Sequence, residues 1–309
     1  MSLIGFGLVK LKGNDSMLRE YPYAELAPGI YEIDEYDNAS MYLLAGTERA
    51  LLIDTGIGIG NVREFAESLT NLPMEVFLTH NHRDHVGNAP LFERVHISEI
   101  DRHMGAMLRP LTTKESRLQY ARHTCSSHPG KKYPWSEDDM FDFTAEREPY
   151  IVSIGDGFIF HLGGRNVICW HCPGHTPGSM VAIDSQTGYL FCGDACNHEI
   201  GLGIRPIEGM RHATVEEAWI ALKRIWAMDF DKTHIYNGHR DYRELGSPLD
   251  VEVFPEAMCV MEQILSGVYR SESKHIAKIN ADVEVVTING MEIQFHRENV
   301  YGIGKEFIL

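Results

Sequence analysis

The segment that most constrains this chain is residues 79–88, Thr-His-Asn-His-Arg-Asp-His-Val-Gly-Asn. It places three histidines and an aspartate close together, namely His80, His82, Asp84 and His85. Neutral imidazole nitrogens and carboxylate oxygens are the ligands that borderline divalent metals prefer. Histidines at i and i+2 leave an extended loop on the same side and can share one ion, whereas Asp84 and His85 project differently and can serve a second. The segment therefore predicts a metal-binding loop.

Two apolar segments of strand length support this interpretation. Residues 74–78 lead directly into the metal-binding loop, and residues 50–53 end in Asp54-Thr55-Gly56. An aspartate at a strand end can accept hydrogen bonds from the backbone of the loop or orient one of its ligands. It can also cap the helix expected after Gly60. Both roles are open for Asp54.

Composition narrows the class of protein. A hydrophobic content of 44% and a charged content of 23% are those of an ordinary soluble globular protein, and 309 residues is not too long for a single α/β enzyme domain. The formal net charge of −16 argues against a nucleic-acid partner. A small-molecule substrate is the expected partner. No segment approaches the roughly 20 apolar residues that span a bilayer, so no membrane partner is expected. The N-terminus lacks a signal pattern and the six cysteines are scattered, which predicts a cytoplasmic protein with free thiols. Assembly into a homo-oligomer stays open.

The chain alternates between strand and helix patterns. Strands are expected at 30–36, 40–54, 74–79, 150–154, 157–162, 166–171, 180–184, 188–192 and 233–236, with a C-terminal hairpin that turns at Asn289-Gly290. Helices are expected at 61–70, at Thr214–Met228 with a capping box, and at Pro255–Tyr269. Residues 100–149 show no clean strand period. We interpret them as an inserted, partly helical cap within one domain that spans residues 1–309.

Three further polar residues follow apolar strands later in the chain. His175 lies in the turn Pro-Gly-His-Thr-Pro-Gly-Ser, whose glycines and prolines fix the backbone so that the imidazole is aimed. Asp194 follows Leu190-Phe191-Cys192-Gly193, and His239 follows Tyr236-Asn237-Gly238. Each is weak evidence alone. Together with the loop they supply seven ligands, enough for two sites of three ligands with Asp194 between them.

The ordered series of these motifs resembles the metallo-β-lactamase-fold hydrolases, in particular the branch of glyoxalase II and the lactonases. The resemblance covers about residues 30–240 and implies an αββα sandwich with the metals at one edge. It implies two divalent metal ions. Zinc is the expected metal, and iron and manganese are the alternatives. The implied ligands are His80, His82 and His175 for one ion, Asp84, His85 and His239 for the other, and Asp194 as a bridge between the ions. Asp54 would not bind a metal itself but would orient the ligands. The sequence has Asn237-Gly238-His239-Arg240 where many relatives have Pro-Gly-His-Gly. It also has an aspartate at position 194, where the true β-lactamases of this fold generally have another residue.

The leading functional hypothesis is hydrolysis of a small ester, thioester or lactone by a hydroxide bridging the two ions, in a binuclear metal-dependent hydrolase. Asp84 and Asp194 are the expected catalytic carboxylates, and Asp194 can assist proton transfer to the leaving group. The cap is expected to shape the substrate pocket, with Tyr133 and Trp135 as lining residues or, alternatively, as interior of the cap. Three alternatives stay open: an iron-dependent dioxygenase or oxygen-reducing di-iron protein, a phosphodiesterase or nuclease, and a metal-binding module without turnover.

Overall fold

The computed structural model describes residues 20–102, 113–126, 133–142, 149–204, 212–276 and 280–302. Its contacts divide the chain into two compact units, which we describe one at a time. The first unit comprises Met1–Ile154, Phe158–Ile168 and Gly238–Ser247, and the second comprises Gly155–Gly157, Cys169–Asn237 and Pro248–Leu309. Whether residues 1–309 form one domain stays a prediction. No helix of the described residues is long and apolar enough to cross a membrane.

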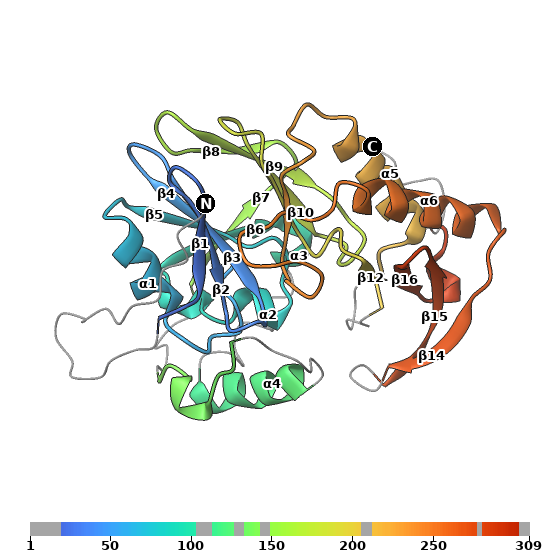
Figure 1. Ribbon diagram of the computed structural model, residues 1–309, viewed down its shortest axis with the longest axis horizontal. Helices are drawn as coiled ribbons and strands as arrows, with labels where there is room; N and C mark the ends of the chain where they lie inside the picture. The colour runs from blue at the N-terminus through green and yellow to red at the C-terminus, as the bar shows by residue number, and fades with distance from the viewer. Residues whose placement is uncertain are drawn as a thin grey trace. The chain divides into compact units, whose positions relative to one another are not determined.

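A sheet of seven described strands dominates the first unit (Figure 1). In spatial order the strands are β1 (Tyr23–Ala27), β2 (Ile30–Asp34), β3 (Ser40–Ala45), β4 (Ala50–Ile53), β5 (Met74–Phe77), β6 (Arg94–Ser98) and β7 (Tyr150–Ile154). The first four pair antiparallel, and β4 to β7 pair parallel. Because β4 and β5 run in the same direction, the residues that follow them emerge at the same edge of the sheet. That edge carries Asp54 and the metal-binding loop.

Helices connect and flank this sheet. They are α1 (Val62–Leu69), α2 (Arg83–Val86), α3 (Glu99–Arg102) and α4 (Lys114–Ser126), with 3-10 turns at η1 (Ala89–Leu91) and η4 (Glu137–Asp139). The segments α4 and η4 make the described part of the inserted region partly helical, as expected. Of the predicted cap, residues 103–112, 127–132 and 143–148 lie outside the described residues. The hairpin strand β8 (Phe158–His161) is hydrogen-bonded to β9 (Asn166–His171).

Two local predictions for the first unit need correction. Residues 40–54 are not one strand but the hairpin β3–β4, which turns through Gly46-Thr47-Glu48-Arg49 with the amide of Gly46 donating to the carbonyl of Arg49 at 2.9 Å. The cap of α1 is Asn61, whose side chain accepts from the amide of Glu64, and not Asp54. Asp54 is thus left for the metal loop.

The second unit holds two sets of strands and two long helices. The strands β13 (Ile235–Asn237), β11 (Leu190–Gly193), β10 (Met180–Asp184) and the end of β9 are neighbours in that order. A further sheet has the order β12 (Glu199–Leu202), β16 (Met291–Phe295), β15 (Ala281–Ile288) and β14 (Glu272–Ile276), and the turn η5 (Arg297–Asn299) follows it. The predicted capping box of Thr214 with Glu217 begins α5 (Val215–Trp226), and α6 is Val253–Ser266. The predicted Asn289-Gly290 turn joins β15 to β16 with positive φ at both residues.

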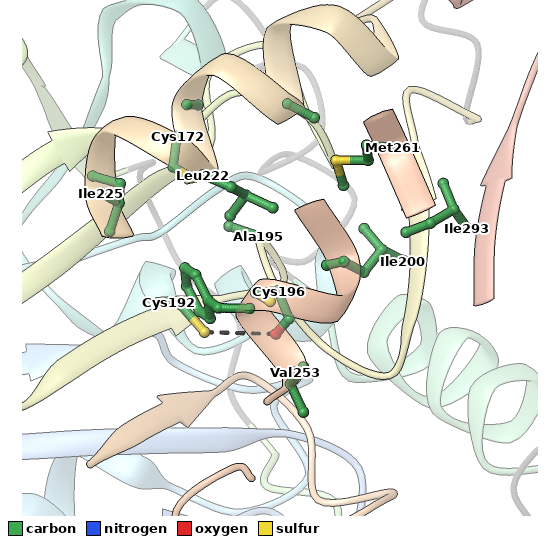
Figure 2. Packing of buried hydrophobic residues seen from close by; sticks show 14 of the residues in the cluster. Cys172, Cys192, Ala195, Cys196, Ile200, Leu222, Ile225, Val253, Met261 and Ile293 are labelled. Atoms are coloured by element: carbon green, nitrogen blue, oxygen red, sulfur yellow. Dashed lines mark hydrogen bonds between the residues drawn. The ribbon is translucent and has the colours of Figure 1, made fainter. Parts of the chain in front are cut away.

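A hydrophobic core joins these elements of the second unit. Leu222 and Ile225 of α5 lie with Met261 of α6 and Ile293 of β16 in one buried cluster (Figure 2). The apolar stripe of α5 is therefore core. The same cluster takes in three cysteines, and the Sγ of Cys192 lies 3.6 Å from the carbonyl oxygen of Cys196 (Figure 2). These three cysteines are free thiols, as are Cys169 and Cys259.

Candidate metal centre

The loop after β5 buries its first two histidines against each other. His80 and His82 are 1% and 3% exposed, and the Nε2 of His80 lies 3.1 Å from the Nδ1 of His82. Two nitrogens bound to one tetrahedral zinc, each about 2.0–2.1 Å from it, stand about 3.3 Å apart. The observed spacing fits a shared ion. The Nδ1 of His80 lies 3.0 Å from the hydroxyl of Thr79, so its other nitrogen is the one turned to His82.

Asp54 organises the loop from the end of β4. Its carboxylate accepts from the amide of Thr79 at 2.8 Å and from the Thr79 hydroxyl at 2.8 Å. Its Oδ2 also lies 2.9 Å from the Nδ1 of His85. A carboxylate on Nδ1 fixes the tautomer of an imidazole and makes Nε2 the metal-binding atom. Asp54 itself has a φ of +61°, a left-handed conformation that aspartate tolerates better than most residues.

A second group of ligands gathers in the same unit. One ligand atom from each of Asp84, His85 and His239 lies within 4.8 Å of the others, which is close enough to hold an ion. The Oδ2 of Asp84 is 3.9 Å from the Nε2 of His239. The other oxygen of Asp84, Oδ1, accepts a hydrogen bond from the hydroxyl of Tyr120 at 3.0 Å.

His239 comes from a segment far along the chain and is fixed to the turn between β2 and β3. Its Nδ1 lies 2.7 Å from the carbonyl oxygen of Asn38, which is 201 positions away. The amide of Ser40 donates to the carbonyl of Gly238 at 2.8 Å. The first bond orients the ring of His239, and the second fixes the backbone just before it. Because Nδ1 contacts the carbonyl oxygen, Nε2 is again left for the metal.

Charged pairs hold the residues that follow His239. The guanidinium of Arg240 contacts the carboxylates of Asp34, at 2.9 Å, and Asp37. The guanidinium of Arg243 lies 2.7 Å from Glu32, and both side chains are almost fully buried. Burial raises the pKa of Asp34 to about 6 even though Arg240 acts to lower it. The surrounding carboxylates raise the pKa of Arg240 above its ordinary value, against the effect of burial.

Glu35 in the same acidic segment bonds to backbone instead. Its carboxylate accepts from the amides of Ile57 at 2.5 Å, Gly58 at 2.8 Å and Ile59 at 2.9 Å. Complete burial raises the pKa of Glu35 to about 7, although these bonds act to lower it. The residues just after Asp54-Thr55-Gly56 are therefore anchored to the turn that also carries Asn38.

The second unit supplies the two remaining predicted ligands. The Nδ1 of His175 lies 3.0 Å from the carbonyl oxygen of Gly201, and its Nε2 lies 3.4 Å from the Oδ2 of Asp194. Gly174 has a φ of +156°, and a Cβ there would stand 2.9 Å from the Cβ of Ala218, so the turn requires glycine. Within this unit, therefore, an imidazole and a carboxylate, two types of zinc ligand, lie side by side at His175 and Asp194.

The chemistry of the donor set fits divalent metal ions. In His80, His85, His175 and His239 alike, Nδ1 lies within hydrogen-bonding distance of a protein oxygen. This is the arrangement that orients metal-bound imidazoles. Each unit also holds a carboxylate beside its imidazoles, Asp84 in the first and Asp194 in the second, and zinc accepts both ligand types.

The structure places the two predicted pocket residues in the first unit, in the inserted region. Tyr133 is 9% exposed and packs in the core of that unit, with the guanidinium of Arg240 over its ring at 5.5 Å. Trp135 is half-buried against the same core. Whether a substrate touches either side chain stays a prediction. Sequence reasoning missed the roles of Asn38, Arg240 and Arg243. Only the cluster of four acids within residues 32–37 could have indicated them.

The pattern of the metallo-beta-lactamase superfamily matches residues 35–239, and the chain belongs to this superfamily. Its enzyme class is accordingly that of a metal-dependent hydrolase. A metallo-beta-lactamase family protein of Thermus thermophilus shares the fold, with a TM-score of 0.54 at 22% identity over 79% of this chain and 82% of that one. The predicted fold type is thus confirmed.

Two curated relatives are informative. The acyl-coenzyme A thioesterase MBLAC2 of Homo sapiens is 28% identical over 196 residues, which cover 58% of this chain and 67% of the relative. The probable polyketide biosynthesis zinc-dependent hydrolase BaeB of Bacillus velezensis is 24% identical over 200 residues, 64% of this chain and 71% of the relative. The narrower glyoxalase II and lactonase branch stays a prediction.

Proposed function

We propose that this protein is a two-metal hydrolase of small thioesters, with the ligands His80, His82 and His175 for one ion and Asp84, His85 and His239 for the other. Asp194 would be the carboxylate shared by the two ions, as the family resemblance implies. The observation that carries the proposal is the preorganised group of the first unit, where Asp54 and Asn38 already orient His85 and His239 beside Asp84.

Thioesters are favoured over esters and lactones by the relatives. One is named as an acyl-coenzyme A thioesterase and another as a zinc-dependent hydrolase of polyketide biosynthesis. The chemistry is consistent with this choice. A thiol has a pKa of about 8.5, so a thiolate leaves with little help from an acid, whereas an alkoxide needs a proton. A site whose polar groups are mostly metal ligands suits the easier leaving group.

The residues of the chain divide the work. Bound divalent ions would activate a water molecule and polarise the thioester carbonyl. Asp54 keeps His85 in the tautomer that binds through Nε2, and Asn38 does the same for His239. Asp194, whose Oδ2 faces the Nε2 of His175, can hold the proton released during attack and pass it to the departing group.

The direct test combines metal content with release of thiol. Protein purified without chelator and loaded with zinc is expected to hold two ions per chain and to hydrolyse acyl-coenzyme A substrates, as followed by a thiol-reactive dye. Chelation should abolish the activity and zinc should restore it. His85→Ala should remove both metal and activity, whereas His161→Ala, at an exposed histidine bonded to Asn166, should change neither.

Other outcomes would assign the site differently. Fewer than about 1.5 ions per chain after full loading contradicts two-metal chemistry. Iron with oxygen uptake in place of thiol release would identify a dioxygenase or di-iron protein. A filled site that turns over none of a panel of thioesters, esters, lactones and phosphodiesters would identify a metal-binding module.

A further inference from the structure

A tyrosine of the inserted region reaches the candidate metal centre. Tyr120, on helix α4, donates its hydroxyl hydrogen to the Oδ1 of Asp84 at 3.0 Å. The guanidinium of Arg83, the residue before Asp84, lies 5.7 Å from the centre of the same ring. The phenol and the ring face of Tyr120 thus engage two consecutive residues of the metal-binding loop.

The two oxygens of Asp84 consequently have different surroundings. Oδ1 accepts from Tyr120, while Oδ2 lies 3.9 Å from the Nε2 of His239 within the ligand group. A carboxylate with a hydrogen bond on one oxygen cannot rotate freely about its Cβ–Cγ bond. The bond from Tyr120 therefore presents Oδ2 to an ion and holds the other oxygen away.

Helix α4 has its own attachments to the first unit. Leu118 and Ala121 pack in the core of this unit. Arg117 is fully buried and donates to the carbonyl oxygen of Phe141 at 2.8 Å. Arg122 forms an exposed ion pair with Glu137 at 2.6 Å. The helix is thus docked independently of Asp84, and this rigid docking lets Tyr120 act as a fixed donor.

We propose that Tyr120 is a positioning residue that couples the inserted region to the metal ion at Asp84, His85 and His239. This inference rests on the proposed role of Asp84 as a ligand. Such a coupling is reciprocal, because a contact that strengthens metal binding is itself strengthened when the metal binds. Binding of this metal ion should therefore hold helix α4 more tightly in place. Conversely, any change that displaces the helix should lower the affinity of the site for the ion.

The test removes the hydroxyl group of Tyr120. Tyr120→Phe keeps the ring over Arg83 and removes the hydroxyl. It should weaken binding of one zinc equivalent by about 10- to 100-fold, the usual effect of losing a group that orients a ligand. The other equivalent should be unchanged in competition with a zinc-binding dye. In Asp84→Asn, which already lacks the charged ligand, adding Tyr120→Phe should cause no further loss of zinc affinity.

Matched controls separate positioning from general loosening. Arg122→Gln breaks the exposed ion pair of α4 with Glu137 and should leave both zinc affinities unchanged. Zinc should slow amide exchange across residues 114–126 in the wild type but not in Tyr120→Phe. Equal zinc affinities in wild type and Tyr120→Phe would overturn the coupling. All of these readouts use zinc alone, so the inference can fail or hold whether or not the protein hydrolyses thioesters.

Discussion

Two segments of the first unit bring ligands to the same place by different means. The loop of residues 79–88 follows β5, and hydrogen bonds of Thr79 and His85 to the carboxylate of Asp54 hold it. The segment of residues 238–247 arrives from the far end of the family match, and buried ion pairs hold it. Local chain direction places the first set of ligands. Long-range contacts place His239, through hydrogen bonds to the turn of Asn38 and Ser40 and through the ion pairs of the residues that follow it.

The difference predicts different weaknesses. A segment fixed by hydrogen bonds to a strand end loses metal affinity when a bond is removed, but it keeps its fold. A segment fixed by buried charges loses stability when one partner is removed, because the remaining charge is left without its partner in a poorly solvated place. Mutations in the two segments should therefore separate metal binding from folding.

The largest effect is expected at the buried ion pair of Arg243 with Glu32. Arg243→Met should lower the free energy of unfolding by about 3–5 kcal/mol, because the carboxylate of Glu32 stays buried after its partner is gone. Urea unfolding of the metal-free protein measures this. Arg297→Met, which breaks the exposed pair with Glu284, is the control and should cost at most about 1 kcal/mol. Equal losses in the two variants would refute the role assigned to buried charge.

The next effect depends on pH and concerns Glu35. Its folded-state pKa of about 7 lies above the ordinary 4.5, so the folded protein holds this proton more tightly than the unfolded chain does. The stabilisation is full below about pH 4.5 and is lost as the pH rises through about 7. The shift corresponds to about 3 kcal/mol over that range. Between about pH 4.5 and 7, the free energy of unfolding of the wild type should fall relative to that of Glu35→Gln. Free energies that change with pH in parallel in the two proteins would contradict the raised pKa.

A smaller effect is expected at Asp54, and it should appear in metal binding. Asp54→Asn should weaken zinc binding by about 10- to 100-fold, since the new amide no longer fixes the tautomer of His85. A zinc-binding dye in competition measures the change. Asp184→Asn, at a buried aspartate that closes a turn with Thr187 in the second unit, should leave zinc affinity unchanged. Loss of folding without loss of zinc affinity in Asp54→Asn would reverse the comparison between the two segments.

The same distinction explains what the sequence could predict. The ligands of the loop, the capping box at Thr214 and the turn at Asn289-Gly290 depend on neighbours within a few positions, and their patterns can be recognised in isolation. The hairpin at residues 46–49 escapes sequence prediction although its turn is glycine followed by polar residues, because the apolar residues on both sides suggest one continuous strand.

The charged network was out of reach for a physical reason. Glu32 and Asp34 alternate with apolar residues in β2, a pattern that normally indicates a solvent-facing side of a strand. Their burial depends on Arg240 and Arg243, which lie about 200 positions away in sequence. The cluster of four acids within residues 32–37 is a local feature of this network, but it does not identify the arginines that pair with it. His239 itself was recognisable from its turn, but the means of holding it there was not.

The smallest effect concerns the two aromatic residues of the inserted region, whose surroundings differ. Tyr133 is buried in the core beside Arg240, so Tyr133→Ala should mainly lower the melting temperature. Trp135 is only half-buried, and its exposed part can contact a substrate. Trp135→Ala should therefore change the relative kcat/KM values across a series of acyl chain lengths, by about 1 kcal/mol or about fivefold, with metal content intact. If relative rates stay constant in Trp135→Ala while the melting temperature falls as in Tyr133→Ala, both aromatics belong to the interior, and substrate selection lies outside this part of the inserted region.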